Sequence, residues 1–160
     1  MLFRSVAGRD LERELVPLIQ DQKLGLMVWS PLAGGLLTGK FSNAEDKGPA
    51  GARRATFDFP VVDKPRAFRC IDVMRPIART HQISVAQVAL AWLLAKSLVT
   101  TVIIGAKSME QLRDNIDSTR VRLDDAEIKQ LDEISALPVE YPGWMLVFQG
   151  QARAKPPVKE

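Results

Sequence analysis

The chain has 160 residues, enough for one domain with a sizeable core, and its 46% apolar and 26% charged residues exclude an intrinsically disordered protein. No apolar run approaches the roughly 18–20 residues that a membrane helix needs, no secretory signal follows Met1, and the single cysteine excludes an internal disulfide, so we expect a cytoplasmic protein. The net charge of +3 suits a polyanionic small-molecule ligand, and no basic patch rich in aromatic residues indicates a nucleic-acid surface.

The first part of the chain predicts a strand end, a helix and a second strand. Residues 1–7 are expected to end a strand, and Asp10 is expected to cap a helix that Pro17 kinks. The apolar residues of that helix recur at helical spacing, at Leu11, Leu15, Leu18 and Ile19. Residues 24–29 form a short apolar run, which predicts a strand buried on both faces.

A glycine-rich segment that ends in a lysine follows this strand. The strand breaks at Ser30-Pro31, and three glycines precede Lys40. Such a segment leaves backbone N–H groups free to point at an anion, which predicts a phosphate site. The alternative is a plain turn followed by a solvated lysine.

The stretch from Gly34 to Lys40 also fits the G-x-x-x-x-G-K pattern of a nucleotide triphosphatase loop. This alternative is disfavoured, because Phe41 stands where a serine or threonine would hold magnesium. The segment after Lys40 is also expected to be a loop, whereas a helix begins there in such proteins.

Residues 41–63 show no sustained periodicity and predict a long loop that covers a bound ligand. The adjacent arginines Arg53 and Arg54 could reach the ligand's phosphates, or they could be ordinary solvated side chains. Phe57 and Phe59 are expected to pin this loop to the body of the protein.

Two helices with apolar faces are expected next. The first runs from about 64 to 80 and should break at Pro76, because an interior proline costs about 3 kcal/mol. Cys70 within it reads as a small core residue. His81, the only histidine, lies in the connection without a catalytic motif around it.

The second helix begins with a capping box formed by Ser84 and Gln87, and its apolar stripe places Trp92 in the core. A β-branched run at 99–104 then predicts another buried strand.

A glycine and a lysine follow this strand, as they follow the strand at 24–29. Gly105 and Lys107 follow it, and Ser108 with Gln111 reads as a capping box. A helix N-terminus beside a lysine favours phosphate, so the chain has a second candidate anion site. Beyond the helix that ends near 117, a last helix starts at Asp124, and residues 138–160 are expected to form an extended tail.

Three stretches resemble the aldo-keto reductase family: 8–15, 29–40 and 104–115. The resemblance runs from about Gly8 to Trp144 and is to the C-terminal half of the family only. The family fold is a (β/α)₈ TIM barrel, so the resemblance implies that residues 1–160 are a single α/β domain forming the last strands and helices of an incomplete barrel. The two predicted strands would be the last two of that barrel, after which such barrels bind phosphate.

The resemblance also implies NADP(H) binding. The residues that it assigns to the cofactor are Trp29 near the nicotinamide, Ser30, Pro31, Leu32, Ala33, Gly34 and Lys40 at the pyrophosphate, Arg53 from the covering loop, Gly105, Lys107 and Ser108 at the 2′-phosphate, and Gln111, Asp114 and Asn115 at the adenine and ribose. Asp114 is shorter than the usual glutamate. Ser108 stands where many members have arginine, which weakens the expected preference for a 2′-phosphate unless Lys107 compensates.

The resemblance assigns no catalytic residue to this chain, because the catalytic tyrosine, lysine, aspartate and histidine of the family lie in the N-terminal half. Tyr141, the only tyrosine, falls in the tail and does not match the catalytic acid. Arg4 stands about where members have a tyrosine that stacks on the nicotinamide. No metal site is predicted.

Three functions therefore compete. The chain is the NADP(H)-binding portion of a carbonyl reductase, inactive alone and active on an aldehyde or ketone only when completed, or it is a non-catalytic NADP(H)-binding or scaffold remnant. The remote third function is the P-loop-like nucleotide binder. Because a piece of barrel has open strand edges, self-association or pairing with a separate N-terminal half is expected.

Overall fold

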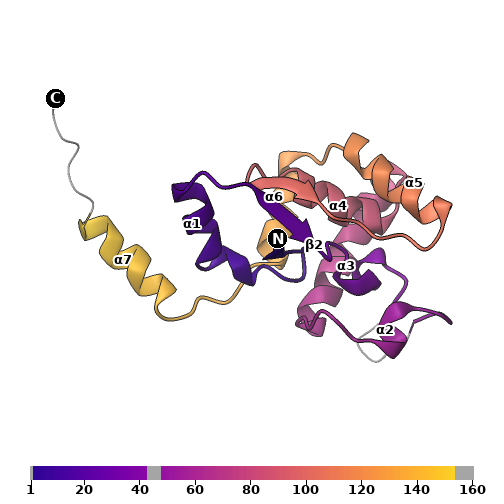
Figure 1. Ribbon diagram of the computed structural model, residues 1–160, viewed down its shortest axis with the longest axis horizontal. Coiled ribbons are helices and arrows are strands. Elements are labelled where there is room, and N and C mark those ends of the chain that lie inside the picture. Colours follow the sequence, from indigo (N-terminus) through magenta and orange to yellow (C-terminus); the bar gives the residue numbers. More distant parts are fainter. Residues whose placement is uncertain (1, 43–47, 154–160) are drawn as a thin grey trace.

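The computed structural model describes residues 2–42 and 48–153 (Figure 1). Three short parallel strands form one sheet in the order β1-β2-β3, where β1 is Leu2–Phe3, β2 is Leu26–Trp29 and β3 is Val99–Val102. The structure thus confirms the strand expected at the start of the chain and both of the later strands, although β3 ends two residues earlier than predicted.

The connections between the strands are mainly helical. Between β1 and β2 lie the 3₁₀ turn η1 (Asp10–Glu12) and α1 (Leu15–Asp21). The remaining elements are η2 (Ala33–Thr38), α2 (Arg53–Thr56), α3 (Lys64–His81) and α4 (Val85–Leu94) before β3, and α5 (Met109–Asp117), η3 (Ser118–Arg120), α6 (Asp125–Ile134) and α7 (Gly143–Arg153) after it.

The core lies between one face of the sheet and the mutually packed helices α3, α4 and α6. Leu26 and Val28 of β2 point into it and are buried. Trp92 and Cys70 are fully buried, as the sequence predicted, and Leu131 of α6 closes the core from the far side. The alternation along β2 therefore sets which side of the sheet the helices occupy.

The opposite face of the sheet is largely uncovered in the described part of the chain. Met27 is 46% exposed, and Ile103, directly after β3, is 40% exposed. The predictions that the strand at 24–29 is buried on both faces and that the strand at 99–104 is buried are therefore wrong for this chain, where α1, α3, α4 and α6 do not reach that side. A parallel sheet normally has both faces covered, so this face is exceptional.

The register of β2 and β3 shifts by one residue between Leu26 and Met27, which marks a bulge in β3. The Thr100 hydroxyl accepts the Leu26 N–H at 3.0 Å and so replaces a backbone partner at the bulge. A Cβ on Gly25 would lie 2.9 Å from that hydroxyl oxygen, which explains a glycine at this position.

The two predictions about prolines have different outcomes. The helix predicted from Asp10 is interrupted in the turn before Pro17, where it divides into η1 and α1, and Pro17 is the third residue of α1. The break predicted at Pro76 is wrong, because helix α3 continues through this residue. Pro76 and Asp72 both lie on the exposed side of α3, where solvent can reach the carbonyl that loses its partner.

The capping box predicted for α4 forms with both reciprocal bonds between Ser84 and Gln87, and at the predicted start of α6 Asp124 and Glu127 form the same pair of bonds. At α5 only half of the box forms, because Ser108 Oγ accepts the N–H of Gln111 but the Gln111 side chain bonds elsewhere.

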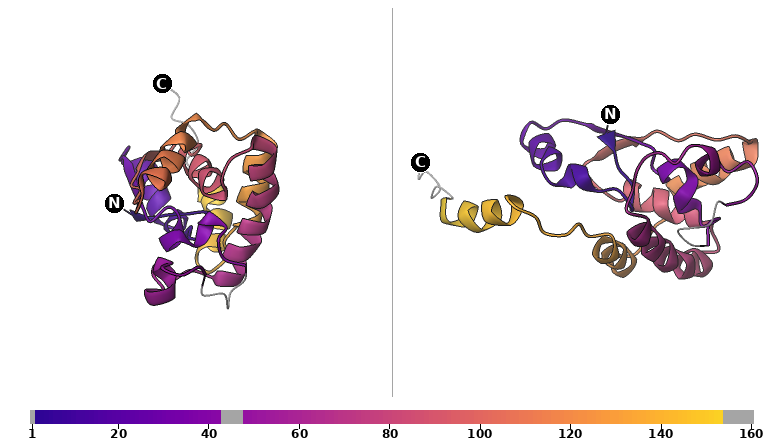
Figure 2. Two further views of the ribbon diagram at one scale, coloured as in Figure 1. Left: turned by 90° about the vertical axis from the view of Figure 1, so that its right-hand side faces the viewer. Right: turned by 90° about the horizontal axis from the view of Figure 1, so that it is seen from below.

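Residues 138–160, expected to be extended, include the helix α7. This helix stands apart from the rest of the molecule in both figures that show the whole chain (Figures 1 and 2). Two of its apolar side chains are open to solvent, with Trp144 50% and Phe148 76% exposed. The structure therefore leaves both α7 and one sheet face without apolar cover in the described residues.

Candidate functional site

The two predicted anion-binding segments open at the same edge of the sheet. Strands β2 and β3 are neighbours and parallel, so their carboxyl ends lie together, and each continues into a glycine-containing loop. In open parallel sheets this edge is where ligands usually bind. We name the segments loop A (residues 30–40) and loop B (residues 103–108).

Loop A is a tight, internally bonded turn. The N–H groups of Ala33, Gly34 and Gly35 donate to Ser30 O, Ser30 Oγ and Leu32 O, at 2.9, 3.2 and 2.9 Å. These three donors are therefore already satisfied, which is contrary to the expectation of free N–H groups. A phosphate at loop A would depend on side-chain charge, or would have to exchange these bonds.

The backbone of loop A is also strained. Ser30 and Ala33 have φ values of 50° and 49°, a left-handed conformation that residues with a Cβ rarely adopt. Strain of this kind concentrates at functional sites. Among the glycines of loop A, Gly34, at φ 66°, is the most tightly enclosed, because a Cβ there would lie 2.5 Å from the carbonyl oxygen of Phe59.

Lys40, at the end of loop A, is exposed and folds back over the loop. A Cβ on Gly35 would lie 3.4 Å from Lys40 Nζ. The residues that follow, 41 and 42, are not helical, which agrees with the argument against a triphosphatase loop. Residues 43–47 of the predicted covering loop lie outside the described residues.

The covering loop contacts loop A through Arg54. Its side chain is 4% exposed, and Nη1 donates to Ala33 O at 2.6 Å and to Pro60 O at 3.1 Å, while Nη2 donates to the Asp58 carboxylate. The neighbouring Arg53, which the resemblance assigned to the cofactor, is exposed, with its guanidinium 5.6 Å from the Phe57 ring centroid.

The Asp58 carboxylate also pairs with Lys64 at 2.7 Å. The hydrogen bond from Lys64, followed by the charge of Arg54, holds the pKa of Asp58 below its ordinary value. The role of Arg54 was missed by the sequence reasoning. An Arg-Arg pair shows that a charge is present, but without the fold it does not show which side chain is buried.

Trp29 lies in a row of aromatic rings. Its centroid is 5.4 Å from that of Phe3 and 5.7 Å from that of Phe59, the latter at an interplanar angle of 19°. Phe59 thus pins the covering loop to the body, as predicted. Phe57 instead packs on Phe59, at 5.4 Å, and is 54% exposed.

Loop B and the start of α5 are organised by Gln111. Its side-chain oxygen accepts the Lys107 N–H at 2.9 Å, and its own N–H donates to Ser108 Oγ at 3.2 Å. Lys107 Nζ donates to Gly51 O at 3.3 Å, which joins loop B to the covering loop. Gly105 is exposed, and a Cβ there would meet no atom within 4 Å.

The two remaining predicted residues of α5 face inward. Asn115 is buried, and its Nδ2 donates to Gly105 O at 3.4 Å. Asp114 is half-buried, and its Oδ2 accepts the Ser84 hydroxyl proton at 2.7 Å. One oxygen of Asp114 is therefore engaged at the start of α4, which limits its reach to a ribose.

Three exposed cations belong to the two loops and the covering loop. Lys40, Arg53 and Lys107 are exposed cations on three connected segments, and the surface at Gly105 is open. Cations of this type recognise phosphate oxygens. The residues that the resemblance assigned to a dinucleotide thus lie on loops A and B and on the covering loop that links them, at the end of β2 (Trp29), and in α5 (Gln111, Asp114 and Asn115).

A second cluster of charges is structural. Arg4, Arg9 and Lys96 surround the buried Trp92 ring at 5.2, 5.6 and 4.8 Å, and Trp92 Nε1 donates to Asp132 at 2.9 Å. Burial lowers the pKa of the Arg4 guanidinium, and its ion pair with Glu12 at 2.6 Å opposes that effect. Arg4 is thus used within the core, away from the nicotinamide position that the resemblance suggested.

The surroundings of Tyr141 and of His81 are not those of a catalytic acid. Tyr141 is 71% exposed beside Trp144, just before α7. His81 Nε2 lies 2.8 Å from the Glu127 carboxylate, which bridges α3 and α6. Among the described residues no group of three His, Cys, Asp or Glu side chains could hold a metal ion, and no helix is long and apolar enough to cross a membrane.

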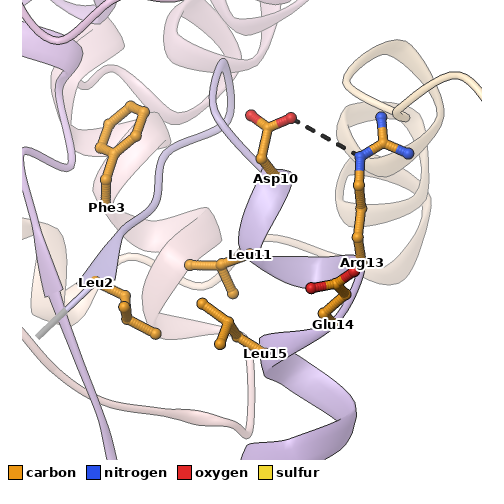
Figure 3. A pocket seen from close by; sticks show the side chains of 7 residues that line it. All are labelled: Leu2, Phe3, Asp10, Leu11, Arg13, Glu14 and Leu15. Atoms are coloured by element: carbon orange, nitrogen blue, oxygen red, sulfur yellow. Dashed lines mark ion pairs between the residues drawn. The ribbon is translucent and has the colours of Figure 1, made fainter.

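A hollow of about 480 Å³ lies at the open edge of the sheet, beside β1 (Figure 3). Its walls are mainly apolar, and the Asp10–Arg13 ion pair borders it at 3.9 Å. The lining residues are Leu2, Phe3, Asp10, Leu11, Arg13, Glu14 and Leu15. The hollow shares no residue with loop A or loop B, although Phe3 touches Trp29.

The chain is similar to several known proteins. Residues 3–136 match the family described as "Aldo/keto reductase family". The chain is 31% identical over 131 residues to the "NADH-specific methylglyoxal reductase" of Escherichia coli and 38% identical over 134 residues to the "Uncharacterized oxidoreductase YrpG" of Bacillus subtilis. These matches cover 82% and 81% of this chain, but only 40% and 38% of the two relatives.

Among solved structures, the chain is similar to the thermostable aldo-keto reductase Tm1743, solved in complex with the inhibitor epalrestat. The TM-score is 0.56 at 26% sequence identity, over 82% of this chain and 37% of the other. The chain thus spans about two fifths of the length of the proteins that it matches.

Proposed function

The chain belongs to the aldo/keto reductase family, and on that premise we propose that it is the NADP(H)-binding, C-terminal portion of a TIM-barrel carbonyl reductase. One observation carries this proposal: loops A and B open side by side after neighbouring parallel strands, and Lys107 is bonded to the covering loop that begins at the end of loop A. That arrangement suits one elongated polyanion held at both ends.

The cofactor, when bound, supplies a hydride for a carbonyl carbon. The chain's own residues bind and orient it. Trp29 offers a ring for the nicotinamide end, Lys40 and Arg53 supply charge for the pyrophosphate, and Lys107 supplies charge for a 2′-phosphate. The full set proposed to hold the cofactor is Trp29, Ser30, Pro31, Leu32, Ala33, Gly34, Lys40, Arg53, Gly105, Lys107, Ser108, Gln111, Asp114 and Asn115.

We propose NADPH over NADH because Lys107 is exposed at the entrance to α5, where the dipole also favours an anion. The hydroxyl of Ser108 already accepts the N–H of Gln111 at the start of α5, and it carries no charge that could pair with a 2′-phosphate. The relative named as NADH-specific makes this preference worth measuring directly.

Reduction of a carbonyl also needs a proton for the developing alkoxide. Tyr141 is exposed on the segment that leads to α7, far along the chain from both loops. We therefore propose that the proton donor comes from outside residues 1–160, and that this chain alone binds the cofactor without turning over an aldehyde or ketone.

The uncovered sheet face supports the need for a complement. Met27 and Ile103 on that face, the open edge of β1 and the hollow beside it are surfaces that a larger barrel would cover. We propose that another copy of this chain or a separate N-terminal half covers them. Sedimentation velocity tests this: a stable monomer with a sharp thermal transition would contradict it.

A non-catalytic NADP(H)-binding or scaffold role is the second candidate, and the position of Tyr141 favours it. Calorimetric titration of the purified chain with NADPH and NADP⁺, followed by an NADPH oxidation assay with a test aldehyde, separates the outcomes. Binding without turnover agrees with both candidates, and turnover on adding a family N-terminal half selects the reductase portion. Turnover by the chain alone would refute the external proton donor, and absence of binding heat would refute the cofactor site.

A further inference from the structure

We propose that Arg54 is a positioning residue: it fixes the covering segment 51–60 on loop A and thereby places its neighbour Arg53 for the phosphates of the cofactor. This inference rests on the proposed function, because it concerns the same dinucleotide site. It assigns different tasks to two adjacent arginines that the sequence does not distinguish.

Arg54 has the contacts of an internal clamp. Its nearly buried guanidinium bridges Ala33 O in loop A and Pro60 O at the other end of the covering segment, at 2.6 and 3.1 Å. The Asp58 carboxylate balances its charge, and Lys64 at the start of α3 holds that carboxylate from the other side. Three parts of the chain therefore meet at one side chain.

The packing around the clamp leaves little freedom. The Phe59 carbonyl oxygen lies so close to Gly34 that no Cβ would fit, and the Phe59 ring stacks on Trp29. Segment 51–60 is thus seated on loop A by the protein's own contacts. A ligand arriving there does not have to order this segment first.

Arg53 is placed differently. The two arginines are successive residues of α2, so their side chains leave the helix about 100° apart. Arg53 is exposed, and its guanidinium lies near the ring of Phe57, which is itself exposed. With Arg54 locked inward, Arg53 is presented to solvent on the same short helix, where an anionic ligand can reach it.

This division of tasks predicts that the two arginines are coupled. Without the clamp, segment 51–60 must be ordered when the cofactor binds, so the affinity falls and release becomes faster. Arg54→Met keeps the apolar stem but removes the donors, and we expect it to weaken NADPH binding about tenfold, because the free energy of ordering the segment is then subtracted from the binding free energy.

The test is a double-mutant cycle on the full chain, with the dissociation constant for NADPH measured for wild type, Arg53→Met, Arg54→Met and the double variant. We expect the Arg54 substitution to have less than about a twofold effect once Arg53 is already methionine. Arg120→Met is the matched control, because that arginine is 83% exposed beyond the far end of α5 from loop B, and it should bind as wild type does.

Additive effects of the two substitutions, or an unchanged affinity in Arg54→Met, would overturn the inference. Wild type that does not bind NADPH would instead refute the proposed function. If Arg54→Met fails to fold, Arg54→Lys and Asp58→Asn weaken the same clamp more mildly. Each variant is then expected to release NADPH faster than wild type in stopped-flow measurements. The same substitution in the Arg53→Met background should change the release rate much less. An equal change of the release rate in both backgrounds would overturn the inference.

Discussion

Lys107 Nζ donates to the carbonyl oxygen of Gly51 at 3.3 Å, a contact between residues 56 positions apart. It joins the loop after β3 to the segment that follows β2, so the two candidate anion sites are parts of one surface. The contact also leaves Lys107 exposed, with donors remaining for a ligand.

Replacing Lys107 should change the choice between the two nicotinamide cofactors. We expect Lys107→Met to weaken NADPH binding about tenfold and NADH binding much less, because only NADPH carries the 2′-phosphate that a lysine can pair with. Calorimetry with both dinucleotides measures this. Lys129→Met removes an exposed charge on α6 as the control. Equal losses for NADPH and NADH would indicate that Lys107 acts only through Gly51.

Gly34 should be far less tolerant of a side chain than Gly105. Gly34 has φ 66° and a backbone oxygen 2.5 Å from the position of a Cβ, whereas Gly105 has open space. We expect Gly34→Ala to lower the free energy of unfolding by about 2–3 kcal/mol, and Gly105→Ala to change it by less than about 0.5 kcal/mol. Urea unfolding of both variants provides the comparison, and similar values for the two would show that loop A adapts.

Asp132 should matter for stability more than its neighbour Glu133. Asp132 accepts from Trp92 Nε1 and from Lys96 Nζ, at 2.9 and 2.6 Å, while Glu133 is 68% exposed and lies 3.9 Å from Lys129. We expect Asp132→Ala to cost about 2 kcal/mol, because it leaves a buried indole N–H without an acceptor, and Glu133→Ala less than about 0.5 kcal/mol. Thermal unfolding of both variants is the measurement. A smaller effect at position 132 would mean that solvent replaces the lost acceptor.

Cys70 should make the protein less stable at alkaline pH. Burial raises the pKa of its thiol from 9.0 to about 11. Between these values the unfolded chain has released the thiol proton while the folded chain retains it, so the free energy of unfolding falls as pH rises. Urea unfolding at about pH 8 and about pH 10 should show a larger fall for wild type than for Cys70→Ala. An equal fall would assign the effect to other groups.

Local sequence patterns predicted the helix starts correctly where residues close together in the sequence form the cap. The caps at Ser84 and Asp124 formed as expected, because the bonding partners lie three residues apart. The continuity of α3 through Pro76 was not predictable, because it depends on that proline facing solvent.

The candidate site was predicted as a set of residues on and next to two glycine-containing loops. The sequence pattern could not show whether each backbone N–H group is free or already hydrogen-bonded. Free N–H groups were expected in loop A, but the left-handed turn at Ser30 and Ala33 satisfies three of them internally. Likewise, only the fold distinguishes the buried Arg54 from the exposed Arg53.

The bare side of the sheet, with Met27 and Ile103 open to water, affects how the molecule behaves at different dilutions. If a second chain covers these side chains, part of the free energy that holds each chain together comes from association and follows mass action. The melting temperature would then rise with protein concentration, and a value measured in a dilute sample would describe a different species from the one in a crowded cell.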